Sequence, residues 1–156
     1  MDSAHIDRLL DDLKNPDETI RQQATEALWQ FWFHQKGIYG LELLQRSQSL
    51  LEAGQVASAE MLLTDLIQHQ PDFAEAWNRR AVLYYMTGRY QQAIQDCKQV
   101  IALNPVHFGA LHGLGLCRAA IGDYLGAIQA FKRALEIQPY AIENQRLLLE
   151  CTIRLG

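Results

Sequence analysis

Residues 74–105, AEAWNRRAVLYYMTGRYQQAIQDCKQVIALNP, have the pattern of two amphipathic helices joined by a tight turn. Trp77, Ala81 and Tyr84 recur at i, i+4 and i+7, which places them on one face of the first helix. Gly88 supplies the left-handed backbone that commonly ends a helix. Pro105 ends the second helix because it lacks the N–H that a helix interior needs. The buried face of that second helix is formed by Ala93, Cys97, Val100 and Ile101.

The same pattern recurs along the chain at intervals of 34 residues, as it does in a repeat protein. Glycine occurs at positions 54, 88 and 122, alanine at 59, 93 and 127, and proline at 71, 105 and 139. Three units follow from this register: 40–73, 74–107 and 108–141. Small residues at matching positions of the first helices let the two helices of a unit approach closely, and these are Ser47, Ala81 and Gly115.

This period and the residues that carry it resemble the tetratricopeptide repeat. The family pattern is matched in the middle unit by Trp77, Ala81, Tyr84, Gly88, Tyr90, Ala93 and Pro105. The last unit matches through Leu114, Gly115, Gly122, Tyr124, Ala127, Phe131, Ala134 and Pro139. The first unit departs most, with Leu43, Leu50, Gly54, Val56, Ala59 and Pro71. The resemblance covers 40–141 and implies an all-α fold: a right-handed α-solenoid of antiparallel helix pairs, whose concave face is built from the first helices.

The segments outside the repeats are expected to cap the solenoid at its two ends. Residues 1–37 are similar to a single HEAT-type helical hairpin, in which Asn15 caps a second helix over 16–36 and Pro16 takes its first position. Residues 142–156 predict a C-terminal capping helix, because a terminal repeat would otherwise expose an apolar face. The alternative is a self-association surface, since this helix carries many apolar residues: Leu147, Leu148, Leu149, Cys151, Ile153 and Leu155.

Residues 28–37, LWQFWFHQKG, hold half of the tryptophan and phenylalanine residues of the chain. One face of this helix is directed at its hairpin partner, and Trp29 and Phe33 fall on the opposite side with Trp32 between them. A helix that is apolar on two sides must be covered twice. We therefore expect a junction between the hairpin and the first helix of unit 40–73, with a second interaction surface as the alternative. The expected contacts are Ile38, Leu43 and Leu50.

Charge and composition restrict the class of partner. The net charge is −4 and the 14 lysine and arginine residues form no run, so no nucleic-acid partner is expected. The acidic N-terminus predicts no secretory signal, and no apolar run approaches the roughly 20 residues of a membrane span. The three widely spaced cysteines are expected to be inert buried thiols in a reducing compartment. These features favour a cytoplasmic location or its bacterial or plastid equivalent.

The sequence contains no recognisable catalytic constellation. It lacks a phosphate-binding glycine loop, a nucleophile elbow and a zinc-protease motif. Its five histidines share no ligand spacing with cysteines or carboxylates, so each is expected on the surface or in packing. We therefore expect a non-enzymatic protein without catalytic, metal-binding or cofactor-binding residues and without a cofactor.

The concave groove is the expected partner-binding site. The family geometry directs six positions of each first helix into the groove. Asn78, Arg79 and His112 form a polar cluster that would orient the partner, while most other positions are apolar or small. The candidate groove residues are Leu44, Gln48, Asn78, Arg79, Val82, Tyr85, Gly109, His112, Gly113 and Leu116.

Gly109 and Gly113 leave bare backbone on the floor of this groove. Each lowers helix stability by about 1 kcal/mol relative to alanine, so each position calls for a reason. Either a partner segment approaches closely there, or Trp77 or Tyr85 from the neighbouring helix fills the gap.

Repeat domains that dock chaperone C-termini hold the terminal carboxylate with lysine, asparagine and arginine. Four of the five matching positions lack the needed donor or charge, so Hsp90/Hsp70-type carboxylate-clamp binding is disfavoured; the positions are Leu44, Gln48, Arg79, Gly109 and Gly113. The sequence thus predicts a protein–protein interaction module, a small scaffold or assembly factor for a protein or peptide of unknown identity. The alternative is a structural homo-oligomer that associates through its terminal helices.

Overall fold

The computed structural model describes residues 2–156, and this part of the chain folds into nine α-helices without a strand. The helices are α1 (Ser3–Asp12), α2 (Glu18–Phe33), α3 (Gly37–Glu52), α4 (Val56–His69), α5 (Ala74–Met86), α6 (Tyr90–Leu103), α7 (Phe108–Ala120), α8 (Tyr124–Ile137) and α9 (Ile142–Leu155). The all-α prediction is confirmed. Within residues 2–156 no helix has the length and apolar character that crossing a membrane requires.

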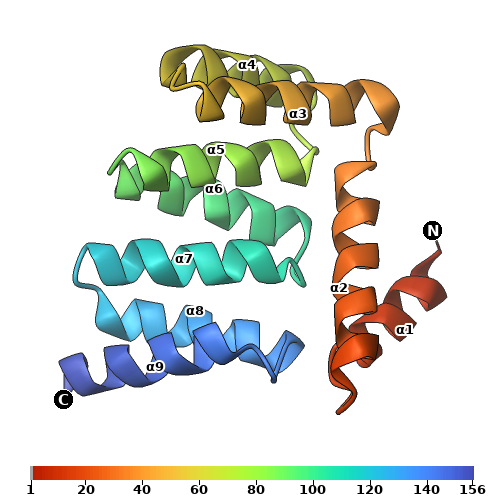
Figure 1. Cartoon of the computed structure of the whole chain (residues 1–156). Coiled ribbons are helices and arrows are strands. Elements are labelled where there is room, and N and C mark those ends of the chain that lie inside the picture. The colour runs from red at the N-terminus through yellow and green to blue at the C-terminus, as the bar shows by residue number, and fades with distance from the viewer. Residues whose placement is uncertain (1) are drawn as a thin grey trace.

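Three helix pairs stack to form the solenoid. The pairs are α3 with α4, α5 with α6 and α7 with α8, and each pair packs on the next. Figure 1 shows α3, α5 and α7 following one another down one side of the molecule, with their partner helices beside them. The helix α9 packs against α8 and ends the stack. The first helices of the pairs therefore share one side, as the resemblance implied.

Glycines in the left-handed region join the two helices of each pair. Gly54, Gly88 and Gly122 have φ angles of 78°, 75° and 80°. Side chains with a Cβ rarely adopt this backbone conformation, so glycine at these positions ends the first helix without strain. Glycine recurs every 34 residues in the sequence because each of these three turns requires it.

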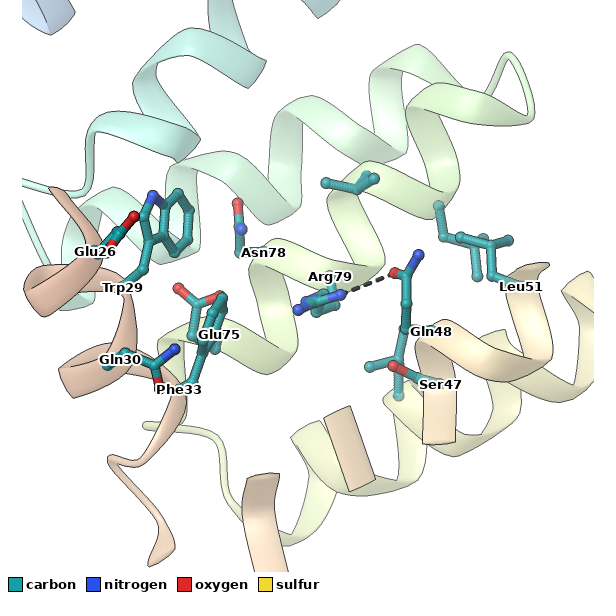
Figure 2. Close-up of a pocket in the computed structure, with 13 residues that line it drawn as sticks. Glu26, Trp29, Gln30, Phe33, Ser47, Gln48, Leu51, Glu75, Asn78 and Arg79 are labelled. Carbon is teal, nitrogen blue, oxygen red and sulfur yellow. Dashed lines mark hydrogen bonds between the residues drawn. The ribbon is translucent and has the colours of Figure 1, made fainter. Parts of the chain in front are cut away.

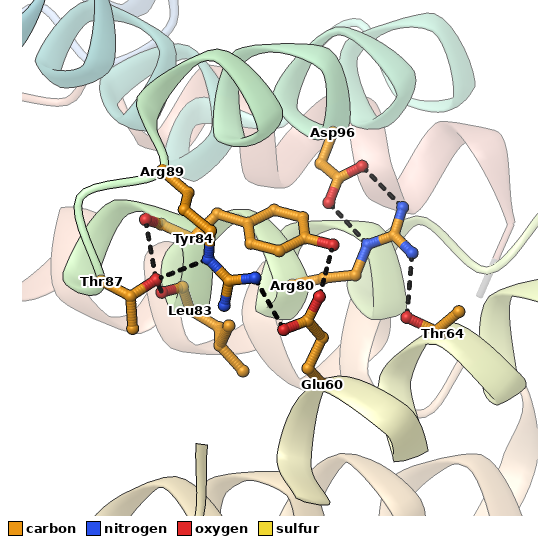
Figure 3. A network of polar contacts seen from close by, with 8 residues as sticks. All are labelled: Glu60, Thr64, Arg80, Leu83, Tyr84, Thr87, Arg89 and Asp96. Atoms are coloured by element: carbon orange, nitrogen blue, oxygen red, sulfur yellow. Dashed lines mark hydrogen bonds and ion pairs between the residues drawn. The ribbon is translucent and has the colours of Figure 1, made fainter. Parts of the chain in front are cut away.

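A polar network holds the first two pairs together on α4, α5 and α6 (Figure 3). The Arg80 guanidinium donates to both carboxylate oxygens of Asp96 at 2.7 and 2.9 Å, and to Thr64 Oγ1 at 3.2 Å. Tyr84 donates its hydroxyl to Glu60 at 3.1 Å. The hydrogen bond with Asp96 raises the pKa of the partly buried Arg80, and burial raises the pKa of Asp96. Repeat-to-repeat stacking thus has a polar component besides its apolar core.

The second helix of the N-terminal hairpin begins later than the sequence predicts. It starts at Glu18 rather than Pro16, because Asp17 is the capping residue and accepts from the Thr19 N–H at 2.9 Å. Asn15 instead accepts from the Asp17 N–H at 2.8 Å, which forms a turn ahead of the helix.

The hairpin lies across the ends of the repeat helices. Figure 1 shows α2 running crosswise near the starts of α5 and α7. Its Leu28 and Trp32 pack with Phe108 at the start of α7. The three residues between α2 and α3, followed by Gly37 at a φ of 70°, turn the chain so that α2 does not lie along α3.

The expected junction exists, but two of its three expected contacts are wrong. Phe33 and Leu43 pack against the same core cluster, so Leu43 belongs to the junction as predicted. Ile38 is 73% exposed, and Leu50 packs against a separate core cluster that extends through the three repeats. The reason is the crosswise path of α2, which brings its aromatic face to the start of α7, a contact that adjacency in sequence could not indicate.

Candidate functional site

The concave side of the helix stack carries two neighbouring cavities. The first has a volume of about 530 Å³ and lies between α2, α3 and α5. The second has a volume of about 190 Å³ and lies between α5 and α7. Asn78 and Val82 line both cavities, so the two form one continuous groove. Figure 2 shows the first cavity with the α2 side chains facing those of α3 and α5.

The structure places nine of the ten candidate residues along this groove. Gln48 and Arg79 line the first cavity only. The shared pair Asn78 and Val82 is followed in the second cavity by Tyr85, Gly109, His112, Gly113 and Leu116. Val82 is 43% exposed and Tyr85 37% exposed, so the junction presents apolar surface to solvent.

Leu44 is not a groove residue. It is 1% exposed and belongs to a core cluster with Leu66 and Phe73. In the family pattern this position faces the groove, but here the side chain packs between α3 and its neighbouring helices. Burying a leucine side chain is favourable by about 2 kcal/mol, which explains this orientation. The assignment of Leu44 to the groove is therefore wrong.

Two of the three polar groups expected to orient a partner are already engaged. Arg79 donates to Gln48 Oε1 at 2.8 Å and lies 5.3 Å above the Phe33 ring. His112 Nδ1 lies 2.5 Å from the side-chain oxygen of Asn144, a residue of α9 that is 4% exposed. Asn78 differs, since Figure 2 draws no hydrogen bond to its amide although the side chain is largely buried.

A buried hydrogen-bonded pair of a carboxylate and an imidazole lies beside the first cavity, and no pattern in the sequence indicated it. Glu75 and His107 are fully buried, and His107 Nε2 contacts Glu75 Oε1. His107 Nδ1 accepts from the Ala110 N–H at 3.0 Å, so the ring proton is on Nε2 and is donated to Glu75. The second Glu75 oxygen, Oε2, has no hydrogen-bond partner among the described residues. The prediction that His107 serves in packing is consistent with this placement.

The aromatic residues of α2 cover this pair. Trp32 stacks on the His107 ring with centroids 4.5 Å apart, and Trp29 meets the same ring edge-on at 5.2 Å. Trp29 also stacks on Phe33 at 5.4 Å. Aromatic pairs in these geometries contribute about 0.5–1.5 kcal/mol each beyond the burial of area. The aromatic segment is thus both a joint of the fold and one wall of the groove.

Trp29 also accounts for the bare backbone of Gly109. A Cβ at Gly109 would lie 2.6 Å from the indole carbon Cη2 of Trp29. The residue that fills this gap is therefore Trp29 from the hairpin, not Trp77 or Tyr85. At Gly113 a Cβ would meet only Cys97 Sγ, at an ordinary 3.5 Å.

Cys97 and Cys117 are both buried and line the second cavity. The neighbouring Cys117 thiol, and then burial, raise the pKa of the Cys97 thiol, whereas Cys97 lowers the pKa of Cys117. A thiol with a raised pKa stays protonated and is a poor nucleophile. This supports the prediction of an inert buried thiol for Cys97.

Two family models, both described as tetratricopeptide repeat, match residues 74–107 and 97–142. Residues 74–142 are therefore tetratricopeptide repeats. The first matched segment has the same bounds as the second unit of the 34-residue period. A TPR repeat-containing protein of Rhizobium etli is 34% identical over 97 residues, which cover 62% of this chain and 48% of the relative. A TPR repeat-containing protein of Bacillus subtilis is 35% identical over 111 residues, covering 71% of this chain and 22% of the relative. The chain thus spans about half or less of these relatives.

Solved structures of TPR domains share this fold. The first TPR of Spaghetti (RPAP3), bound to the HSP90 peptide SRMEEVD, superposes with a TM-score of 0.71 at 23% identity, over 74% of this chain and 91% of that one. The Sgt2 TPR domain from Aspergillus fumigatus gives a TM-score of 0.68 at 22% identity, over 73% and 77% of the two chains. At these identities the likeness shows the helical solenoid and leaves the ligand of this chain open.

Proposed function

We propose that this TPR protein is a non-enzymatic interaction module that captures a segment of a protein partner in its concave groove. The observation that carries the proposal is the continuous groove formed by the two cavities, with the exposed side chains of Val82 at their junction and Tyr85 in the second cavity. Exposed apolar surface in a concave site of several hundred Å³ is typical of ligand-binding regions. Related TPR domains with bound peptides support the same use of the fold.

Roles as a small scaffold or assembly factor, in the cytoplasm or its bacterial or plastid equivalent, fit such a module and are part of this proposal. A carboxylate clamp for Hsp90 or Hsp70 C-termini remains disfavoured. Gln48 is held by Arg79, Leu44 is buried, and Trp29 covers Gly109, so these clamp positions present no cation to a terminal carboxylate.

The test is peptide capture by a groove variant. Arg79→Ala combined with Leu116→Asp places a charge in the second cavity and removes the bond to Gln48 in the first. Peptides selected from a random 12-residue display library on the wild-type chain are expected to lose binding to this variant. Circular dichroism and thermal unfolding check that the variant folds. Undiminished binding by the folded variant would place capture elsewhere and contradict the proposal.

A homo-oligomer is the second candidate, and the last helix favours it. Ile142, Leu149 and Ile153 of α9 are 78%, 61% and 68% exposed. Light scattering over a concentration series separates the two candidates. A mass that rises with concentration, and returns to the monomer value in Leu149→Lys with Ile153→Lys, supports association through α9. A strict monomer at all concentrations contradicts it.

A further inference from the structure

The first cavity is lined by carboxylates, which have no role in the capture of a partner by apolar contact. Glu26 and Glu75 line it together with one guanidinium, that of Arg79. We propose that this cavity binds a lysine or arginine side chain of the partner, with the aliphatic stem against Trp29 and Phe33 and the cationic head at Glu75. The inference rests on the proposed capture of a polypeptide segment and names the side chain that the groove selects.

Glu75 has an acceptor that no neighbouring group satisfies. Its Oε1 is used by His107, whose other ring nitrogen is held by the Ala110 N–H, so His107 has no second proton to donate. Arg79, one turn along α5, donates to Gln48 instead. Oε2 is buried and without a donor among the described residues. An unpaired buried acceptor is unfavourable, and a donor on a ligand relieves that penalty.

The walls of the cavity suit the stem of a long basic side chain. Lysine and arginine cover apolar surface with their methylene groups while the charged head seeks a polar site. Trp29 and Phe33, stacked 5.4 Å apart, form such an apolar wall, and Figure 2 shows Glu75 at the same end of the cavity as these two residues. A guanidinium or ammonium next to an indole also gains a cation–π attraction.

The charges around the cavity favour a cation over an anion. Glu26 is exposed at the rim, where its carboxylate attracts a basic side chain from solvent. The one lining guanidinium, that of Arg79, is directed to Gln48 and the Phe33 ring. An acidic side chain would meet two carboxylates here. A neutral apolar side chain would fill the walls and leave Glu75 Oε2 unpaired.

The experiment is an NMR titration of the isotopically labelled full chain with three small probes. They are the N-acetyl methylamides of arginine, norleucine and glutamate, which share a backbone and differ in the side-chain head. The reporter is the indole N–H of Trp29, assigned with Trp29→Phe. The expected result is that arginine shifts this resonance with saturation, norleucine binds at least about tenfold more weakly, and glutamate has no effect. Equal binding of arginine and norleucine would overturn the proposal.

Three matched charge-removing variants locate the head group. Glu75→Gln is expected to weaken the arginine probe about tenfold, because the charge-assisted bond becomes a neutral one. Glu26→Gln is expected to weaken it less, and Glu42→Gln, an exposed residue of α3 outside the cavity, not at all. If Glu75→Gln does not fold, the comparison of the three probes on the wild type and on Glu26→Gln decides. Unchanged arginine binding by folded Glu75→Gln contradicts the assignment.

The random peptide library distinguishes failure of this inference from failure of the proposed function. Groove-binding peptides enriched in lysine or arginine support both. Groove-binding peptides without that enrichment contradict the basic-side-chain site and leave peptide capture standing. The absence of any groove-binding peptide, with the arginine probe still bound at Trp29, contradicts peptide capture and supports the acidic site.

Discussion

The indole of Trp29 lies against the bare backbone of Gly109, so close that a Cβ on the glycine would be 2.6 Å from an indole carbon. This contact joins the N-terminal hairpin to the third repeat across more than seventy residues of sequence. It makes α2 a wall of the groove, and the first cavity owes its aromatic side to this arrangement. The contact yields a direct test by substitution at two glycines of the same helix.

Gly109→Ala and Gly113→Ala are expected to change stability in opposite directions. Both gain about 1 kcal/mol of helix propensity. At Gly109 the new methyl group displaces Trp29, and overpacking of this kind costs about 1–3 kcal/mol. At Gly113 the methyl group meets Cys97 Sγ at an ordinary 3.5 Å. Urea unfolding measures the free energy of unfolding of both variants. The tryptophan fluorescence is expected to shift in Gly109→Ala and not in Gly113→Ala. Equal stabilisation of the two variants would contradict the Trp29 contact.

Gly115→Ala is expected to destabilise the third pair by about 1–3 kcal/mol. A Cβ at Gly115 would lie 2.5 Å from the ring of Phe131, which is fully buried and has no space to withdraw. Thermal unfolding measures the loss. Phe131→Leu combined with Gly115→Ala is the control, because a smaller side chain on α8 makes room for the methyl group. A wild-type melting temperature in the single variant would contradict this close approach of α7 and α8.

Asp96→Ala is expected to destabilise the fold by about 3–5 kcal/mol, since it leaves the Arg80 guanidinium largely buried without its carboxylate. The matched control is Arg146→Ala. Arg146 pairs with Glu143 and Glu150 on the exposed face of α9, where ion pairs are screened, and no measurable change is expected. Chemical unfolding of both variants checks the contrast. A loss of similar size in the two would show that burial of the Arg80 pair is unimportant.

The lowered pKa of Asp123 predicts that the folded protein loses stability in acid. The Asp123 carboxylate caps α8 by accepting from the Gly126 N–H, and this hydrogen bond, followed by that from Arg118, lowers the pKa of Asp123 below its ordinary value of 3.8. The unfolded chain therefore binds this proton more tightly than the folded chain. The contribution of Asp123 is complete above about pH 4 and is lost as pH falls through the lower folded-state pKa.

The check is the melting temperature of the wild type and Asp123→Asn between pH 6 and pH 2.5. The asparagine keeps a capping oxygen and removes the titrating group. The wild type is expected to lose more stability than the variant over this interval. Parallel curves would contradict a lowered pKa at Asp123.

The repeat array was predictable from sequence because each of its features is local. The glycine turns, the small columns and the prolines recur at a fixed interval, and the helix pairs pack with their sequence neighbours. Nine of ten groove positions follow from that register. Leu44 departs from it, because the first helix of the most divergent unit uses that face to pack on Phe73.

The features that the sequence did not predict depend on contacts between residues that are far apart in the chain. The pattern of LWQFWFHQKG showed that α2 needs a second cover, but not that the cover is Phe108 and the Glu75–His107 pair. The crosswise direction of α2 is determined by a three-residue turn, and the sequence of this turn has no periodic pattern from which its geometry could be predicted. The candidate basic-side-chain site depends on this direction, so only the structure reveals it.

The most direct test of the central claim, that the concave groove captures a polypeptide segment, is chemical-shift mapping of a library-selected peptide on the labelled full chain. The largest changes are predicted at groove residues of the junction and of the second cavity, at Asn78, Val82, Tyr85, Gly113 and Leu116. Changes confined to α9 around Leu149 and Ile153, with these groove amides unmoved, would contradict it.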